Sequence, residues 1–143
     1  MPHILRNILA CLAGLIVGSM VNGGIIAASA AVVPPPEGVN VNDAASIAAN
    51  IHLYQPKHFA PPFLAHALGT LAGAVVAVAL SAKRRIGPAY VIGGIFLLAG
   101  VAMCFMIPAP AWFITLDLVV AYIPMAWLGG TLARSRATTQ PPK

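Results

Sequence analysis

Charged side chains are scarce in this sequence. Of its 143 residues only 8% are charged, with eight basic and three acidic side chains. A soluble domain carries roughly a quarter charged residues, and a chain this short leaves much of its surface exposed. Hydrophobic residues make up 59% of the chain, and its mean hydropathy is +0.88. These values exclude an ordinary soluble domain and indicate a protein that lies in a lipid bilayer.

Motifs of several common enzyme classes are also missing. The sequence contains no GxSxG, Walker, dinucleotide-binding or CxxC motif, so the enzyme classes that use these motifs have no support. The histidines and acidic residues do not follow a zinc pattern such as HExxH. We therefore expect no metal site and no cofactor.

Four apolar runs are each long enough to cross a membrane as a helix. They extend from Ile4 to Val33, from Pro62 to Ala82, from Ile86 to Ile107 and from Ala111 to Leu132. A helix needs about 20 apolar residues to span the hydrocarbon core, where unpaired backbone groups are not tolerated. The sequence therefore predicts one all-α membrane domain over residues 1–143. Its fold would be a four-transmembrane-helix bundle with an outer loop over 34–61 and a C-terminal tail over 133–143.

Basic residues lie in three clusters that predict the orientation of this bundle. The clusters are Arg6, then Lys83 to Arg85, and then Arg134, Arg136 and Lys143. Positively charged loops stay on the cytoplasmic side of a membrane, so both termini and the turn at 83–85 are placed there. The basic residues are not interleaved with aromatic side chains along one face, so we expect no nucleic-acid partner.

The first apolar run allows a second interpretation. Arg6, an apolar stretch and then Ala28-Ser29-Ala30 form the pattern of a secretory signal peptide with an A-x-A cleavage site. The run is longer than the apolar core of such a signal, and Gly14, Gly18 and Asn22 form a stripe at a spacing of four. We expect a retained membrane helix, with cleavage as the open alternative.

Two glycine motifs predict how the first two long helices pack. The motif GLIVG contains Gly14 and Gly18, and the motif GTLAG contains Gly69 and Gly73. Small residues spaced by four let membrane helices approach closely. We expect the two stripes to face each other, which brings Asn22 into the same half of the bundle as His66. The same glycine-rich faces could also join two copies as a homodimer.

The central functional hypothesis concerns two titratable residues inside the predicted spans. His66 lies near the start of the second span, and Asp117 is the only acidic residue in any span. Burying such groups in lipid is costly unless they find partners. Both lie at a similar depth beneath the outer surface, so we expect them to contact each other and share a proton. Pro124 is expected to kink the helix that carries Asp117.

The loop over residues 34–61 adds further polar residues. Three prolines stiffen its start, and Asn42 or Asp43 can cap a short helix that runs to about Asn50. We expect this loop to bring Glu37 and His58 to the outer mouth of the bundle. The predicted binding residues are Asn22, His66, Asp117, Glu37 and His58, and the candidate catalytic residues are His66, Asp117 and Glu37.

Two segments carry a resemblance to a known group of proteins. They are VPPPEGVNV…HLYQPKHFAPPFLAHALGTLAG, with its PPPEG and HALGT motifs, and PAPAWFITLDLVVAYIPMAWLGG. The chain resembles uncharacterised short four-span bacterial inner-membrane proteins over about Arg6 to Leu132. The resemblance implies a multi-pass topology and a bacterial inner membrane, and it implies no activity.

Three functions are compatible with these features. The first is binding or transport of a proton or small solute at His66 and Asp117, with Glu37 as a gate, because ionisable residues inside membranes mark such pathways. The second is an intramembrane enzyme that acts on a lipid with His66 and Asp117 as an acid–base pair. The third is a structural or assembly protein in which the pair is a packing contact. A contact beside a cavity favours the first two functions, and a sealed contact favours the third.

Overall fold

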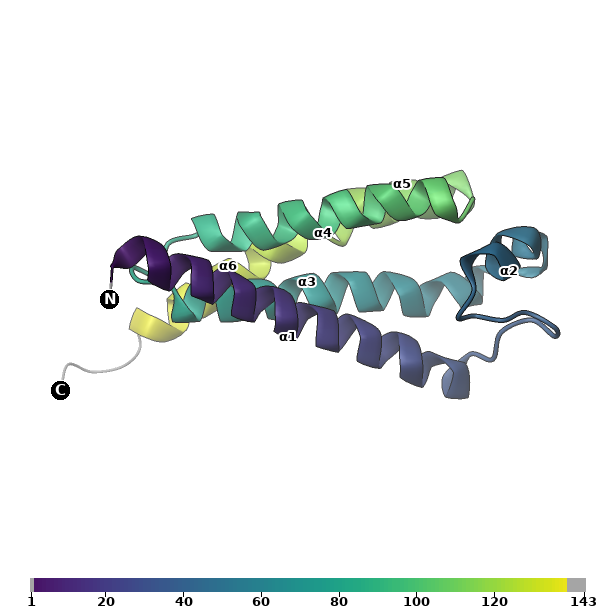
Figure 1. The fold of residues 1–143 in the computed structure, drawn as a ribbon, viewed down its shortest axis with the longest axis horizontal. Coiled ribbons are helices and arrows are strands. Elements are labelled where there is room, and N and C mark those ends of the chain that lie inside the picture. The colour runs from purple at the N-terminus through teal and green to yellow at the C-terminus, as the bar shows by residue number, and fades with distance from the viewer. Residues whose placement is uncertain (1, 139–143) are drawn as a thin grey trace.

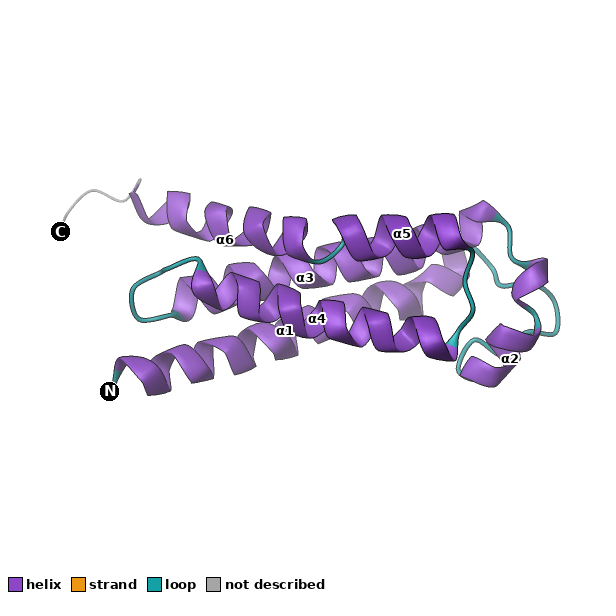
Figure 2. Cartoon of the chain, turned by 90° about the horizontal axis from the view of Figure 1, so that it is seen from above, coloured by secondary structure: helices purple, strands orange, loops and turns teal. Residues whose placement is uncertain are grey.

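The computed structural model describes residues 2–138. Within this range the chain is helical and contains no strand, as Figure 2 shows. The α-helices are α1 (His3–Val32), α2 (Ala44–Ala49), α3 (Ala60–Leu80), α4 (Gly87–Met106), α5 (Ala111–Val120) and α6 (Ile123–Thr138), and the short 3-10 helices η1 (Ile51–Leu53) and η2 (Pro56–Phe59) precede α3. The predicted all-α class is confirmed.

Four helical segments among the described residues are long and apolar enough to cross a membrane. They are His3–Val32, Pro56–Leu80, Gly87–Met106 and Ala111–Ser135. Each overlaps one of the four apolar runs predicted from the sequence, so the number of spans agrees with the prediction. The fourth span differs from the prediction because it combines α5 and α6 rather than forming one continuous helix.

The long helices run between two ends of the bundle, which we call the basic end and the loop end (Figure 1). The basic end holds the start of α1, the turn at 81–86 and the end of α6. The loop end holds residues 33–59, which include α2, and the turn at 107–110. The predicted tail over 133–143 begins inside α6, and its residues 139–143, including Lys143, lie outside the described residues.

Direct contact between glycines joins α1 and α3. A Cβ atom added at Gly14 would lie 2.6 Å from the carbonyl oxygen of Gly73, and one added at Gly18 would lie 2.7 Å from that of Gly69. Such close backbone contact is possible only where no side chain intervenes. The two stripes therefore face each other within one chain, as their spacing predicts. The homodimer through glycine-rich faces stays a prediction, and within one chain these four glycines already contact one another.

Two hydrogen bonds also tie the start of α1 to the end of α3. Nε of Arg6 donates to the carbonyl oxygen of Leu80 at 2.9 Å, and Oδ1 of Asn7 accepts from the backbone N–H of Ala82 at 2.9 Å. The last buried residue of α1 is Gly18. The first half of α1 is thus fixed against α3, whereas Figure 1 shows the second half diverging from it toward the loop end.

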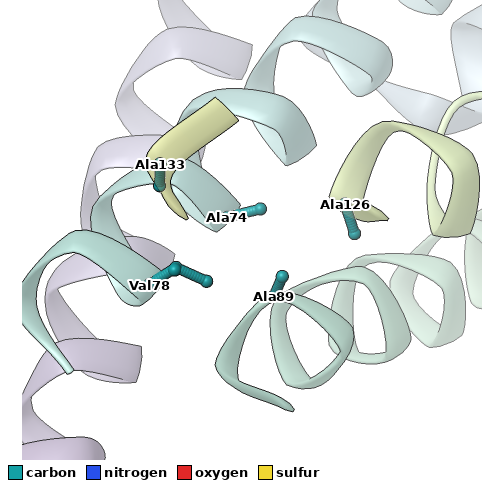
Figure 3. Close-up of a cluster of buried hydrophobic side chains, with 5 residues drawn as sticks. All are labelled: Ala74, Val78, Ala89, Ala126 and Ala133. Atoms are coloured by element: carbon teal, nitrogen blue, oxygen red, sulfur yellow. The ribbon is translucent and has the colours of Figure 1, made fainter. Parts of the chain in front are cut away.

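Small side chains hold α3, α4 and α6 together near the basic end. A buried cluster between these helices consists of Ala74, Val78, Ala89, Ala126 and Ala133 (Figure 3). Methyl-sized side chains let helix backbones approach closely, which is how helices associate where no water drives them together. The tightly packed part of the bundle therefore lies toward the basic end.

The fourth span is interrupted between Val120 and Ile123. Pro124 has no N–H group with which to bond to the carbonyl group of Val120, four residues earlier. Residues 121 and 122 form a turn there, and the chain continues as α6. The kink predicted from Pro124 is therefore present as a break in the helix.

Short helices and contacts between aromatic rings make up the loop end of the bundle. The carboxylate of Asp43 caps α2 by accepting a hydrogen bond from the backbone N–H of Ala45 at 3.0 Å. The ring of Phe59 lies 4.9 Å from that of Phe113 and 5.6 Å from that of Trp112, centroid to centroid. These ring contacts, at distances typical of aromatic pairs, join η2, which directly precedes α3, to the start of α5.

Candidate functional site

His66, Asp117 and Tyr122 form a hydrogen-bonded group, which we call the polar cluster. Nδ1 of His66 lies 2.9 Å from each carboxylate oxygen of Asp117. The Tyr122 hydroxyl donates to Oδ2 of Asp117 at 2.9 Å, and its oxygen lies 3.1 Å from Nδ1 of His66. The rings of His66 and Tyr122 stack with their centroids 5.7 Å apart. The predicted contact between His66 and Asp117 is confirmed.

Different elements position the three side chains. His66 lies on α3, Asp117 on α5, and Tyr122 in the turn between α5 and α6. In an unbroken helix, side chains five residues apart would point about 140° away from each other, and the break after Val120 removes this constraint. Gly100 of α4 leaves room for the phenol, because a Cβ atom at that position would meet the Tyr122 hydroxyl oxygen.

Hydrogen bonds to Asp117 and Tyr122 orient the imidazole of His66. Only 7% of the Asp117 side chain is exposed, whereas 25% of the His66 side chain is exposed. An ionised carboxylate only accepts hydrogen bonds, so an ionised Asp117 places a proton on Nδ1 of His66. Every hydrogen bond of His66 within residues 2–138 uses Nδ1. Nε2 therefore has no partner among these residues.

A cavity of about 610 Å³ lies beside the polar cluster and extends to the loop end. All three cluster residues line it, and α1, α2, α3, α4 and α5 contribute to its wall. The rest of the lining is mostly apolar and includes Ile26, Val41, Ile47, Phe59, Phe96 and Met103. Small-molecule sites have volumes of roughly 300–1,000 Å³. The contact between His66 and Asp117 thus lies beside a cavity of ligand size rather than inside a sealed core.

Thr70 contributes an unpaired hydroxyl group to the same cavity. Its side chain is fully buried, with 0% of the residue exposed, and Oγ1 has no hydrogen-bond partner among the described residues. Hydroxyl groups in helices commonly bond to a carbonyl three or four residues earlier, as Thr115 does to Ala111 at 2.9 Å. An unpaired buried hydroxyl costs about 1–3 kcal/mol. Thr70 is therefore a candidate group for binding a ligand.

The other predicted site residues are not part of the polar cluster. Asn22 of α1 lines the cavity and packs against Gly69 of α3. His58 also lines the cavity, but its Nδ1 accepts the backbone N–H of Gln55 at 2.8 Å and so belongs to the cap of η2. Glu37 is exposed and is not among the cavity-lining residues. Its expected place at the mouth of the site is corrected, because Glu37 lies in an exposed turn and does not line the cavity.

Two residues of the site, Thr70 and Tyr122, are not among those predicted from the sequence. Thr70 follows His66 by four residues, so a helix places both on one face, and this spacing was a signal for Thr70. Tyr122 had no such signal, because its distance of five residues from Asp117 places it on another face of a regular helix. Its role depends on the break at residues 121–122.

Neither metal-ligand groupings nor relatives point to a function. Within residues 2–138, no group of three or more His, Cys, Asp or Glu side chains could hold a metal ion. Comparisons of the chain with protein-family models, with curated proteins and with solved structures find no match. The chemistry of the cavity and the polar cluster is therefore the basis for assigning a function.

Proposed function

We propose that the protein binds a small molecule inside the membrane, in the cavity beside the polar cluster, and that its role is to bind or transport this molecule. The supporting observation is the cavity of about 610 Å³ lined by His66, Asp117 and Tyr122. Ionisable residues within membrane spans are rare and usually belong to ligand or ion pathways. A contact that served packing alone would need no such cavity, and cavities lower stability.

The proposed setting is a bacterial inner membrane, with both termini in the cytoplasm. Arg6 and the turn that carries Lys83 to Arg85 lie at the basic end, which the positive-inside rule assigns to the cytoplasmic side. The loop end and the cavity would then face the outer surface. The resemblance of the PPPEG and HALGT segments to short four-span bacterial proteins supports the same setting.

Quenching of Trp112 fluorescence tests whether the cavity takes a ligand. The ring of Trp112 lies 5.6 Å from that of Phe59, which lines the cavity. The sequence has two tryptophans, so a Trp127→Phe background leaves Trp112 as the single fluorophore. Dibrominated octadecanol, whose bromine atoms quench nearby tryptophan, is titrated into the purified protein in micelles. Saturable quenching is expected.

Gly23 and Gly24 offer a matched pair of cavity and control variants. A Cβ atom added at either position meets no atom within 4 Å, but only Gly23 lines the cavity. We expect Gly23→Leu to weaken probe binding by about fivefold or more, because the leucine side chain occupies space that the hydrocarbon chain of the probe would fill. Gly24→Leu should leave the affinity within about twofold. Non-saturable quenching that is equal in both variants would refute binding in the cavity.

A pH gradient across proteoliposomes separates transport from binding alone. Asp117→Asn keeps the size of the side chain but removes its ionisable group. If the polar cluster carries protons, the wild-type protein should dissipate the gradient faster than protein-free liposomes, and the Asp117→Asn protein should not. Equal rates in all three samples would restrict the proposed function to binding.

The unpaired Nε2 of His66 supports an intramembrane enzyme as the second candidate function. A histidine whose Nδ1 is held by a carboxylate has the orientation of the general base in hydrolytic triads. In such an enzyme, Nε2 would exchange a proton with a lipid bound in the cavity while Asp117 held the ring. Mass spectrometry of the lipids after incubation tests this possibility. Conversion by the wild type and not by His66→Gln would favour the enzyme, and no conversion would favour binding.

A further inference from the structure

We infer that the ligand is an uncharged amphiphile with a hydroxyl head group, which hydrogen-bonds to Thr70 and to Nε2 of His66 while its apolar chain extends toward the loop end. This inference rests on the proposed function and adds the chemical class of the ligand. Three features of the cavity support it: its charge, the two unpaired polar atoms that Thr70 and His66 of α3 supply, and its shape.

The charges around the cavity disfavour a charged head group. Among the described residues, no Lys, Arg or Glu side chain lines the cavity, and Asp117 is the one carboxylate that does. A buried charge needs an opposite charge or several hydrogen bonds. An anionic head would lie near Asp117 without a cation of its own. A cationic head would compete with His66 and Tyr122, which already bond to the carboxylate.

A hydroxyl group matches the two unpaired polar atoms better than a carbonyl group does. Thr70 follows His66 by one helical turn, so both side chains lie on the same face of α3. The Thr70 hydroxyl can donate to the oxygen of an alcohol, and the alcohol can donate its own proton to Nε2 of a neutral imidazole. A carbonyl oxygen only accepts and would leave a neutral Nε2 unpaired. An alcohol or phenol therefore satisfies both atoms without adding charge.

The shape of the cavity gives the ligand a direction. Thr70, His66 and Pro62 all line it along α3, and eight helical residues correspond to about 12 Å. Beyond Pro62 the wall continues through apolar side chains of the loop end, including Val41, Ile47, Ile51 and Phe59. Thr70 and His66 thus lie at the end of the cavity away from the loop end, and a hydrocarbon chain would occupy the mostly apolar part beyond them.

Three probes that share one dibrominated octadecyl chain test the charge of the head group. One carries a hydroxyl, one a sulfonate and one a trimethylammonium group, and each is compared by Trp112 quenching at equal mole fraction in the micelle. We expect the alcohol to bind at least about tenfold more tightly than either charged probe. Equal or tighter saturable binding of a charged probe would overturn the inference and leave cavity binding intact. Absence of saturable binding by any probe would overturn the proposed function itself.

Thr70→Val and Thr70→Ser test the hydrogen bond to the head group. Valine keeps the shape of threonine and removes a hydroxyl that has no intramolecular partner, so the fold should be retained. We expect Thr70→Val to weaken alcohol binding by about three- to tenfold and Thr70→Ser to leave it within about twofold. Dibrominated octadecane, which lacks a head group, should bind equally to all three proteins. Unchanged alcohol binding in folded Thr70→Val would overturn the role assigned to Thr70.

Discussion

The contact between α1 and α3 predicts that one methyl group at Gly14 destabilises the whole bundle. A Cβ atom added there would lie 2.6 Å from the carbonyl oxygen of Gly73 and 2.9 Å from Cβ of Ala77, whereas ordinary contacts begin at 3.4 Å. The Gly73 oxygen is part of the backbone, so it cannot rotate away and the helices must separate. Overpacking of this kind costs about 1–3 kcal/mol, and we expect Gly14→Ala to lose that much free energy of unfolding.

Gly24→Ala is the matched control on the same helix. No atom lies within 4 Å of a Cβ added at Gly24, so the new methyl group meets no neighbour. Alanine should stabilise α1 there by about 0.5–1 kcal/mol, because glycine loses more backbone entropy on folding. The two variants add the same methyl group, yet their free energies of unfolding should differ by about 1.5–4 kcal/mol.

Titration of the purified proteins from mild micelles into SDS, followed by circular dichroism, measures this difference. Both variants should keep the helix content of the wild type before unfolding, so a change in midpoint reports stability. Equal free energies for Gly14→Ala and Gly24→Ala would show that α1 does not pack on α3 through the glycine stripe. The assignment of α1 residues to the cavity wall would then be wrong as well.

Two further predictions concern the polar cluster and the loop end. Gly100→Ala should destabilise the protein by about 1–3 kcal/mol, because the added Cβ atom displaces the Tyr122 hydroxyl. In the control Gly94→Ala on the same helix, the added Cβ atom meets no atom within 4 Å and should have little effect. Equal midpoints of SDS unfolding for the two variants would contradict this prediction. Burial raises the pKa of Tyr54 above its usual value of 10, so the folded state holds the phenol proton more tightly than the unfolded state. Stability should therefore fall as the pH rises above about 10, and Tyr54→Phe should remove part of this fall. The pKa of Tyr54 is measured as the difference between the absorbance titrations of the wild type and of Tyr54→Phe. A pKa at the usual value of a tyrosine would contradict the prediction.

The pairing of His66 with Asp117 was predictable because few alternatives existed. Asp117 is the only acidic residue within the predicted spans, and the depth of each residue follows from its distance to the end of its span. The facing of the glycine stripes was predictable for a similar reason, since consecutive membrane helices joined by one loop are antiparallel neighbours. These inferences needed only spacing along a regular helix.

The remaining features of the site depend on departures from regular helices. Tyr122 joins the cluster because the chain breaks at residues 121–122, and Pro124 indicates a kink without indicating which side chain it redirects. The cavity depends on the divergence of α1 from α3 beyond Asn22, and no local sequence pattern encodes this divergence. The loop over 34–61 predicts both Glu37 and His58 at the site, but only His58 lines the cavity, and its Nδ1 is engaged in a backbone cap, while Glu37 lies in an exposed turn.

The uneven attachment of α1 suggests a route by which the proposed hydrophobic ligand would reach His66. Bonds from Arg6 and Asn7, together with Gly14 and Gly18, hold the first half of this helix, whereas Gly23 and Gly24 have no neighbours within 4 Å of an added Cβ atom. Bending beyond Asn22 would open a lateral path from the acyl chains of the bilayer without disturbing the alanine-rich core. Entry from the surrounding lipid would then require neither passage through water nor unfolding of the loop, and the exchange rate would depend on the stiffness of one helical segment.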